Sequence, residues 1–553
     1  MTPHTPRPTR IAMSAALACT LVPMTAPAQT ATDLAARQPL PAQFVWSTVA
    51  NSADAIPGGD GRKFNSFNQP SVNAAGRVVL RARSRGGQGA GEPLRGIYAR
   101  PMAGTPGPLV SVFDTLTEVP APNNTLYQDK LGTFTEFPAF PRVGLDNDTV
   151  TTRAQSRPVW TYTATDGTET RVGTSGIYAQ RGGERVSAMT QLGAVPGFEV
   201  YSVPGAAPGT RFDQFPGAPA VANANTVVFK GNYTEGTGKT GIFFRSFGGT
   251  GVPAQTQVIA SSDTTIPGQP ADGVRFASTS PPSASARDAV FLGLDNEEAP
   301  TLGGIYLAPL ATRPALQTLA SIGGQAPGES AGTSFNRLGE ALSYDGRFVA
   351  YWGAWGTQTR SIMLTCPTDG QAAVIAFCLS KYPNGLTVQV PANQGFFVHD
   401  VLTRKALPVA KTGGDYVDFL YWVFSGRPPG VGDGESEDFE EPRWRASSFV
   451  AAYSQGSNVQ VAFKARRPTT PVTDGIYLAL PSASPSPPPP RTVVETMSPA
   501  TLLDPMAPAG ATVVSVGLER DGLRNRWLAI TASMLDAVTS DSWAGVYVTR
   551  TGK

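Results

Sequence analysis

Short apolar or alternating segments recur along the chain and are separated by turn residues. Examples are residues 77–82 (RVVLRA), 226–229 (TVVF), 288–291 (DAVF), 347–350 (RFVA) and 459–463 (VQVAF). Strict alternation, or a short apolar run between Gly and Pro signals, is typical of β-strands, whereas a helix would repeat its apolar positions every three to four residues. The pattern therefore predicts an all-β chain of many short strands.

A Gly-aliphatic-aromatic triplet recurs downstream of these strands. Its glycines are Gly96, Gly176, Gly241, Gly304, Gly475 and Gly545, with a looser copy at Gly395. Neighbouring copies are 63 to 91 residues apart, which gives seven units of about 75 residues. Many units also open with a Phe-rich segment such as Phe64–Phe67 and close with a proline turn such as Ile266–Gly268. We read each unit as four short strands, and seven such units predict a seven-bladed β-propeller with four antiparallel strands per blade.

The two ends of the chain complement each other. The last unit stops after its third strand, whereas residues 50–58 match the exit of a fourth strand at residues 260–268 in spacing and residue type. An open ring would leave unpaired backbone groups at both edges. We therefore expect the N-terminal strand to pair into the last blade and close the ring.

These patterns also give the expected boundaries of the chain's parts. We expect a signal peptide at 1–28, a short linker at 29–42 and the propeller at 43–553. Within the propeller, the closing strand takes 43–60, and the blades take 64–122, 134–204, 212–270, 276–330, 335–426 with an insertion, 439–512 and 513–553.

The combination of Phe-rich opening, Val-Val-Phe strand, Gly-Ile-Tyr strand and Pro-Gly exit resembles a known group of proteins. It is similar to the secreted bacterial tandem-repeat propellers of the choice-of-anchor type, and residues 395–403 resemble the blades of TolB-like and WD40-like propellers. The resemblance covers essentially the whole chain after residue 42 and implies the fold. It brings no catalytic residues with it, and no sorting tail follows the last unit.

The first thirty residues have the pattern of an export signal. Arg7 and Arg10 precede an apolar stretch at 11–22, and Ala26 and Ala28 occupy the small-residue positions of a signal-peptidase site. The alternative is a lipoprotein attached through Cys19. No later apolar run approaches the ~20 residues that span a bilayer. We expect an exported protein, periplasmic or extracellular, without a transmembrane segment.

Charge and cysteine content narrow the picture. The chain has 44 Lys and Arg against 42 Asp and Glu, a net charge of +2, so it lacks the basic excess of a nucleic-acid binder. After cleavage only Cys366 and Cys378 remain. An even pair in an oxidising compartment indicates a disulfide, with two buried reduced thiols as the alternative.

Insertions are expected to gather on one face of the propeller. Because the strands of a blade alternate in direction, the connections after the second and fourth strands emerge on one face and those after the first and third strands on the other. Three insertions share the first of these faces: a hairpin around Asp166-Gly167, a long insertion in blade five and the segment between blades five and six. The aromatic residues there are candidate platforms for sugar rings, or they pack the insertions together. These candidate ligand-binding residues are Trp160, Tyr162, Trp352, Trp355 and Tyr382.

An acidic run lies between blades five and six. Its residues Asp433, Glu435, Glu437 and Asp438 resemble a calcium loop only loosely, since the spaced Gly and terminal Glu of an EF-hand are missing. A solvated loop is the favoured interpretation, with calcium as a weak alternative. We expect no other cofactor.

Catalytic motifs are scarce. After signal cleavage His399 is the sole histidine, which excludes a histidine metal cluster and favours a structural role. Residues 328–332 (GESAG) match the nucleophile-elbow string but lack its strand-turn-helix context. We assign no catalytic residue.

Two classes of function remain. The favoured one is an exported, monomeric binding or scaffold protein that presents its loop-rich face to a glycan, an extracellular polymer or a protein. The alternative is a propeller lyase or hydrolase acting on an extracellular polysaccharide. Such an enzyme would place paired carboxylates or a perturbed Tyr at the mouth of the axial channel, whereas a binder would show a shallow aromatic surface.

Overall fold

The structure of this chain is a computed structural model. It describes residues 40–41, 43–86, 91–124, 126–127, 130–156, 160–163, 167, 169–172, 175–247, 254–368, 372–427, 440–483 and 488–552. The expected signal peptide, most of the linker and Cys19 lie outside the described residues.

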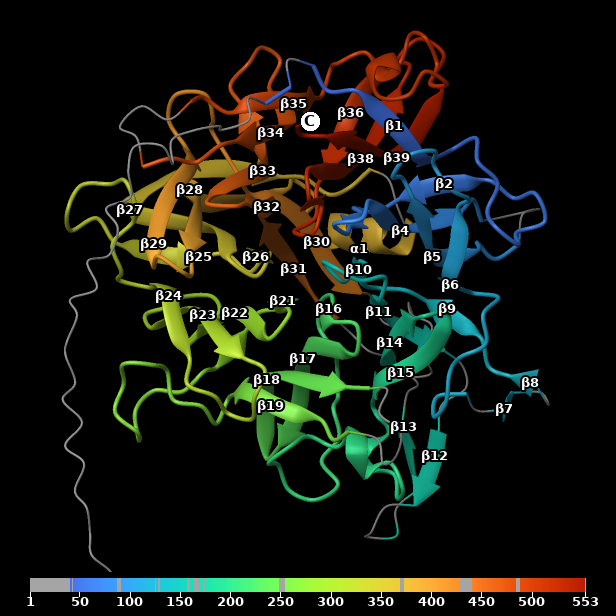
Figure 1. The fold of residues 1–553 in the computed structure, drawn as a ribbon, viewed down its shortest axis with the longest axis vertical. Helices are drawn as coiled ribbons and strands as arrows, with labels where there is room; N and C mark the ends of the chain where they lie inside the picture. The colour runs from blue at the N-terminus through green and yellow to red at the C-terminus, as the bar shows by residue number, and fades with distance from the viewer. Residues whose placement is uncertain are drawn as a thin grey trace, which may run out of the picture. The chain divides into compact units, whose positions relative to one another are not determined.

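Seven antiparallel sheets are arranged around a central axis in the unit formed by Leu40–Lys553, which confirms the predicted seven-bladed β-propeller (Figure 1). In five blades the innermost strand is broken into two short pieces that pair with the same second strand. The strands of blades one to three are β2 (Phe64–Phe67), β3 (Ser71–Val72), β4 (Arg77–Ser84), β5 (Arg95–Pro101), β6 (Val110–Asp114); β9 (Phe134–Glu136), β10 (Arg142–Val143), β11 (Val150–Ser156), β14 (Gly176–Arg181), β15 (Glu184–Thr190); and β16 (Ala220–Asn223), β17 (Thr226–Glu235), β18 (Thr237–Ser246), β19 (Gln257–Ser261).

Blades four to seven follow the same plan. Their strands are β20 (Ser278–Thr279), β21 (Ser283–Ser285), β22 (Asp288–Leu294), β23 (Gly303–Pro309), β24 (Gln317–Ser321); β25 (Phe335–Leu338), β26 (Ser343–Tyr344), β27 (Phe348–Leu364), β28 (Leu386–Asp400), β29 (Lys405–Lys411); β32 (Val450–Gln455), β33 (Asn458–Arg467), β34 (Thr473–Ala479), β35 (Arg491–Glu495); and β36 (Thr512–Gly517), β37 (Leu523–Arg524), β38 (Trp527–Leu535), β39 (Ser542–Arg550) with β1 (Trp46–Asn51).

The ring closes through the N-terminal strand, as predicted. β1 pairs antiparallel with β39 from Trp46 opposite Thr549 to Asn51 opposite Gly545. Beyond the ladder, the Asn51 amide donates to the Asp504 carboxylate at 2.8 Å, so the exit of the strand is also held by the loop between blades six and seven. The outer position of the last blade is therefore filled from the other end of the chain.

The glycine of the recurring triplet is required by packing. Residues two apart on a strand share a face, so the aromatic ring of the triplet folds back over its own glycine. A Cβ on Gly96 would lie 2.7 Å from the Tyr98 hydroxyl. The same ring meets the opening Phe of its blade edge-on, as in Phe64–Tyr98 at 5.1 Å between centroids. Both rings lie in a core cluster shared with blade seven, so the aromatics pack between blades.

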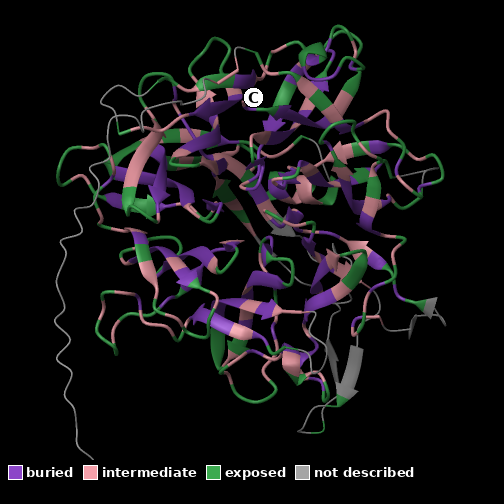
Figure 2. Cartoon of the chain, viewed as in Figure 1, coloured by how far each residue is buried: buried purple, intermediate pink, exposed green. Residues whose placement is uncertain are grey.

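Figure 2 shows that the buried residues lie mainly on the blade strands and the exposed residues mainly in the connecting turns. None of the described helices is long and apolar enough to span a membrane.

The predicted insertions are present, and one of them contains a helix that the sequence did not predict. The hairpin of β12 (Trp160–Thr163) and β13 (Glu169–Val172) has the expected pairing. In blade five, β27 and β28 extend beyond the sheet and flank α1 (Ala372–Lys381), which is rich in the strong helix formers Ala and Leu. Cys366 and Cys378 form the predicted disulfide and tie α1 to the end of β27.

The remaining elements connect blades. They are the hairpins β7 (Leu126–Tyr127) with β8 (Lys130–Leu131) and β30 (Tyr421–Arg427) with β31 (Glu440–Ser447), and the 3₁₀ turns η2 (Leu192–Ala194), η3 (Glu199–Tyr201) and η4 (Ala500–Leu502). In Figure 1, α1 and the β30–β31 hairpin project over the centre of the ring. They also contact each other, with Phe377 and Phe424 at 6.5 Å between ring centroids.

Candidate functional site

The ring axis is closed by residues 518–524 of blade seven, which we call the axial plug. The Arg520 guanidinium donates to the carbonyl of Pro281 in blade four at 3.1 Å. Blades four and seven lie on opposite sides of a seven-membered ring, so a direct bond between them must cross the axis. The Ser343 hydroxyl of blade five donates to the Arg520 carbonyl at 2.6 Å.

Charges in the axial plug are buried and paired. Arg142 of β10 is 0% exposed, and its Nη1 lies 3.1 Å from Glu519 and 2.8 Å from Asp521. Arg524 pairs with Asp521 and donates to the carbonyl of Ala452 in blade six at 2.8 Å. Burying a charge is costly unless it is paired, and here the pairing binds one blade to several others.

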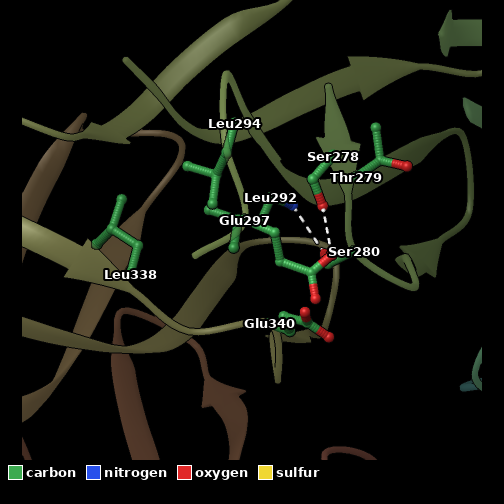
Figure 3. A pocket seen from close by; sticks show the side chains of 8 residues that line it. All are labelled: Ser278, Thr279, Ser280, Leu292, Leu294, Glu297, Leu338 and Glu340. Carbon is green, nitrogen blue, oxygen red and sulfur yellow. Dashed lines mark hydrogen bonds between the residues drawn. The ribbon is translucent and has the colours of Figure 1, made fainter. Parts of the chain in front are cut away.

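A small recess of about 60 Å³ lies between the inner strands of blades four and five (Figure 3). The innermost strand of each blade begins at the insertion face. The first half of this strand in blade four, at Ser278–Ser280, lines the recess. The plug contacts the innermost strands further along, at Pro281 and Ser343. The recess therefore opens towards the insertion face. Its lining combines hydroxyl, leucine and glutamate side chains: Ser278, Thr279, Ser280, Leu292, Leu294, Leu338, Glu297 and Glu340.

The charged side chains that line this recess, Glu297 and Glu340, and the nearby Lys230 are placed by their local structure. Glu297 lies in the loop between β22 and β23, where Asp295 accepts from the Leu302 amide at 3.0 Å and fixes the turn. Glu340 lies in the break between β25 and β26, off the ladder. Lys230 follows the buried Phe229 on β17. Because successive side chains of a strand point to opposite faces, Lys230 lies on the face opposite to Phe229.

The carboxylates of Glu297 and Glu340 point towards one another in Figure 3. Glu297 accepts from the Ser278 hydroxyl at 3.2 Å. Among the residues that the structure describes, Glu340 and Lys230 make neither a hydrogen bond nor an ion pair. We call Lys230, Glu297, Glu340 and the nearby Arg443 the vestibule.

The vestibule charges nevertheless influence one another. Burial raises the pKa of Glu340, Lys230 lowers it, and Glu297 raises it further. Burial lowers the pKa of Lys230, an effect opposed by Glu340 and Glu297. Arg443 of β31 acts on both groups, and Arg520 acts on Glu340. The side chain of Glu340 is exposed to solvent while protein surrounds it, as expected for the wall of a recess.

The β30–β31 hairpin that carries Arg443 is anchored by a buried network. Asp418 is 1% exposed and lies 2.5 Å from Arg360 on the extension of β27. Gln394 donates to Asp418 at 2.9 Å and accepts from the indole of Trp352 at 3.1 Å. This network joins blade five to the start of the hairpin and so fixes one side of the vestibule.

Trp352 and Trp355 do not present a platform for a ligand. They are 4% and 6% exposed and pack in the cores beside blades six and four, with Trp355 against Phe397 at 5.8 Å. Their positions fit the packing alternative, because both lie on the regular part of β27 before it leaves the sheet.

The other aromatic candidates lie on insertions. Tyr382 follows α1, and its ring packs 6.2 Å from Phe424 and 6.4 Å from Trp444 of the β30–β31 hairpin. Trp160 and Tyr162 occupy β12, but their side chains lie outside the described part of the chain. The large apolar residues exposed among the described residues include no aromatic side chain.

The weak calcium candidates Asp433, Glu435, Glu437 and Asp438 lie outside the described residues. Within the described ranges, no group of three or more His, Cys, Asp or Glu side chains is arranged to hold a metal ion.

His399 lies in a buried strand, whereas the GESAG segment lies in a turn between two blades. His399 is buried in β28 beside Leu319 of blade four, and burial lowers its pKa. Ser330 pairs with Thr333 at 3.0 Å in a turn between blades four and five, and Glu329 pairs with Lys411 at 2.8 Å. Ser330 and His399 therefore lie apart in the fold, Ser330 in an exposed turn and His399 in a buried strand.

Sequence reasoning did not single out Lys230, Glu297, Glu340 or Arg443. No signal was available for Lys230, because the equivalent strand position is also basic in blades one, two and six, where it is Arg81, Arg153 and Lys464. Glu297 and Glu340 lie in loops and strand breaks, where charged residues are common and carry no pattern.

Comparison with known proteins gives little beyond the fold. No known protein-family model matches the chain, and no curated protein matches its sequence. A prolyl endopeptidase structure has a TM-score of 0.31 and 10% identity, covering 87% of this chain and 49% of its own length. A Hadza microbial sialidase has a TM-score of 0.27 and 10% identity, covering 64% and 65%. The chain thus spans about half of the first protein and just under two thirds of the second, and at these TM-scores neither bears on its function.

Proposed function

We propose that this protein is an exported binding protein whose insertion face takes up an extracellular glycan or other polymer, with the vestibule as its polar contact. The observation that carries the proposal is the set of charges in the vestibule. Lys230 and Glu340 influence each other and Glu297, yet neither has a hydrogen-bond or ion-pair partner among the described residues. Glu340 is exposed and Lys230 is half-buried, so their charged groups are open to solvent and available to a ligand.

The position of the vestibule supports the same proposal. Its floor is closed by the axial plug, and its side is bounded by the anchored β30–β31 hairpin. A ligand therefore approaches from the face that carries the insertions, where a polymer has most surface to contact. At about 60 Å³ the recess is far smaller than the ~300 Å³ of a small-molecule pocket, so most of the contact must come from that face.

A second candidate is a glycoside hydrolase, favoured by one observation. Two carboxylates face each other at the axial mouth, and the pKa of Glu340 is raised while Glu297 accepts a hydroxyl hydrogen bond. Glycosidases use such a pair, with the raised-pKa carboxyl as general acid and the ionised carboxylate as base or nucleophile. In this role Glu340 is the acid and Glu297 its partner.

A glycan array followed by mass spectrometry of the eluted glycans separates the two candidates. The binding proposal predicts retention without new chain ends, and retention that falls at least tenfold in Lys230→Met and Glu340→Gln. The matched control is Glu184→Gln, a glutamate 62% exposed in the turn on the opposite face. New chain ends that disappear in Glu340→Gln would support the hydrolase instead. Failure of the wild-type protein to retain any glycan or polymer would refute the binding proposal.

A further inference from the structure

The vestibule has the lining of a site for hydroxyl groups. A sugar hydroxyl donates one hydrogen bond and accepts others, so it can donate to a carboxylate and accept from an ammonium group at the same time. Glu340 and Lys230 offer these two functions without using them on each other. Ser278 already shows the pattern, since its hydroxyl donates to Glu297 at 3.2 Å.

The charges of the vestibule select against an ionic ligand group. A carboxylated or sulfated sugar would face the Glu297 and Glu340 carboxylates, and an amino sugar would face Lys230 and Arg443, with Arg520 below. Like charges at close range in a partly enclosed site are costly. An uncharged group that bridges both signs avoids either penalty.

The recess is amphipathic, as a sugar ring is. One part of its wall is formed by the buried Leu292, Leu294 and Leu338, and the opposite part by the glutamates. A hydroxymethyl group can lay its methylene against the leucines while its hydroxyl turns to Glu297 or Glu340.

The recess is also blind. Below it the axial plug joins blade seven to blades four and five through Arg520, at 3.1 Å to Pro281 and 2.6 Å to Ser343. Its volume of about 60 Å³ is room for roughly four or five waters at about 10–15 Å³ each, which a hydroxymethyl group and a neighbouring hydroxyl would replace. A polymer chain cannot pass through the recess, because its floor is closed. A sugar residue in the middle of a polymer chain has a neighbour on both sides and cannot enter it, whereas a terminal residue has one free end.

We infer that the vestibule binds the terminal residue of an uncharged glycan end-on, with a hydroxymethyl group and a neighbouring hydroxyl entering the recess between the leucines and the Glu297–Glu340 pair while the ring stays at its mouth. The inference rests on the proposed function and adds the ligand class and the mode of engagement.

An array of defined oligosaccharides tests this inference. Each neutral chain is printed in two forms, with its terminal ring free or O-methylated, beside chains that end in a uronate or an amino sugar. We expect the wild-type protein to retain neutral chains with a free terminal ring, and O-methylation to weaken retention about tenfold or more, because it removes the donor hydrogens. Lys230→Met and Glu340→Gln should lose the discrimination, whereas Glu184→Gln should keep it.

The outcomes separate the two levels of the proposal. Equal retention of free and O-methylated chains, or preference for uronate or amino-sugar ends, overturns end-on recognition of a neutral residue but leaves glycan binding in place. Absence of retention for every chain by the wild-type protein overturns the proposed function itself. Thermal unfolding of each variant shows whether a loss of retention is accompanied by a loss of folding, and Glu340→Gln is nearly isosteric with the native side chain.

Discussion

The axial plug and the vestibule are neighbours close to the ring axis, since Arg520 of the plug acts on Glu340 of the vestibule, and both are rich in charge. In the plug, Arg142 is completely buried and contacts Glu519 and Asp521 within 3.1 Å. In the vestibule, Glu340 lines the recess and Lys230 lies near it, and neither has a hydrogen-bond or ion-pair partner among the described residues. Full burial makes an unpaired charge costly, whereas a wet recess tolerates it. The comparison shows that the fully buried charges near the axis are paired, whereas Lys230 and Glu340, which solvent reaches, are not; the proposed function uses these two groups.

The largest expected effect is on the plug. Arg142→Ala should lower the free energy of unfolding by about 3–5 kcal/mol, because it leaves the buried carboxylates of Glu519 and Asp521 without their shared cation. Urea unfolding followed by fluorescence measures the change. Lys230→Met serves as the comparison, with an expected change below about 1 kcal/mol. Equal losses in both variants would erase the distinction between plug and vestibule.

The next effect concerns the insertion beside the vestibule. Replacing both Cys366 and Cys378 by Ser removes the bond across a separation of 12 residues, which corresponds to about 2–3 kcal/mol of loop-closure stabilisation. We expect this loss to appear locally, as faster amide exchange in α1 and in β30, with little change in β4 or β11. Uniform acceleration across all blades would show that the insertion is not a separate cooperative part of the fold.

A smaller effect compares two lysines in equivalent strand positions. Lys464 follows Phe463 in blade six as Lys230 follows Phe229 in blade three, but Lys464 lies under the ring of Tyr421, 3.8 Å from its centroid. Burial lowers the pKa of Lys464 to about 8, below its ordinary value of 10.5. The folded protein therefore binds fewer protons than the unfolded chain in this range.

It follows that the free energy of unfolding should rise between about pH 8 and pH 10 through Lys464. Lys464→Met should flatten that rise in thermal unfolding measured across this range. A wild-type profile no steeper than that of the variant would contradict the burial of this ammonium.

The smallest expected effect concerns Glu340. The free energy of unfolding should change with pH in the opposite direction to that expected for Lys464. Burial raises the pKa of Glu340 above the ordinary value of 4.5, so the folded protein holds this proton longer than the unfolded chain does. Stability from this group should fall as the pH rises above about 4.5, and Glu340→Gln should remove that decline. At neutral pH the variant should be at least as stable as the wild-type protein. A clear loss of stability in Glu340→Gln would mean that the vestibule is structural like the plug.

The fold could be predicted from the sequence because each blade repeats the same local packing problem. In blades one to five a glycine precedes an aromatic residue by two positions, and the aromatic ring packs against the opening phenylalanine of the blade. This packing requirement repeats the same sequence pattern from blade to blade. Strand closure was also visible, since the exit of β1 matches the exit of β19. The position of each blade in the ring then follows from its order along the chain.

The vestibule could not be predicted, because its residues come from four distant segments that carry no shared pattern. Lys230, Glu297, Glu340 and Arg443 span more than two hundred residues, and each is ordinary in its own neighbourhood. The tryptophans show the converse case, since the sequence left binding and packing open and their burial favours packing. Trp352 and Trp355 stood out by type beside an insertion, yet strand alternation and core volume placed them inside.

The pairing of β1 with β39 has a consequence for how the chain matures. The first strand is made almost five hundred residues before its partner. At the ~5–20 residues per second of synthesis, it waits roughly half a minute to a minute and a half as an open edge. During that time its free backbone groups are exposed to any other strand nearby. Correct closure of the ring thus depends on keeping the leading strand unoccupied until the trailing strand arrives.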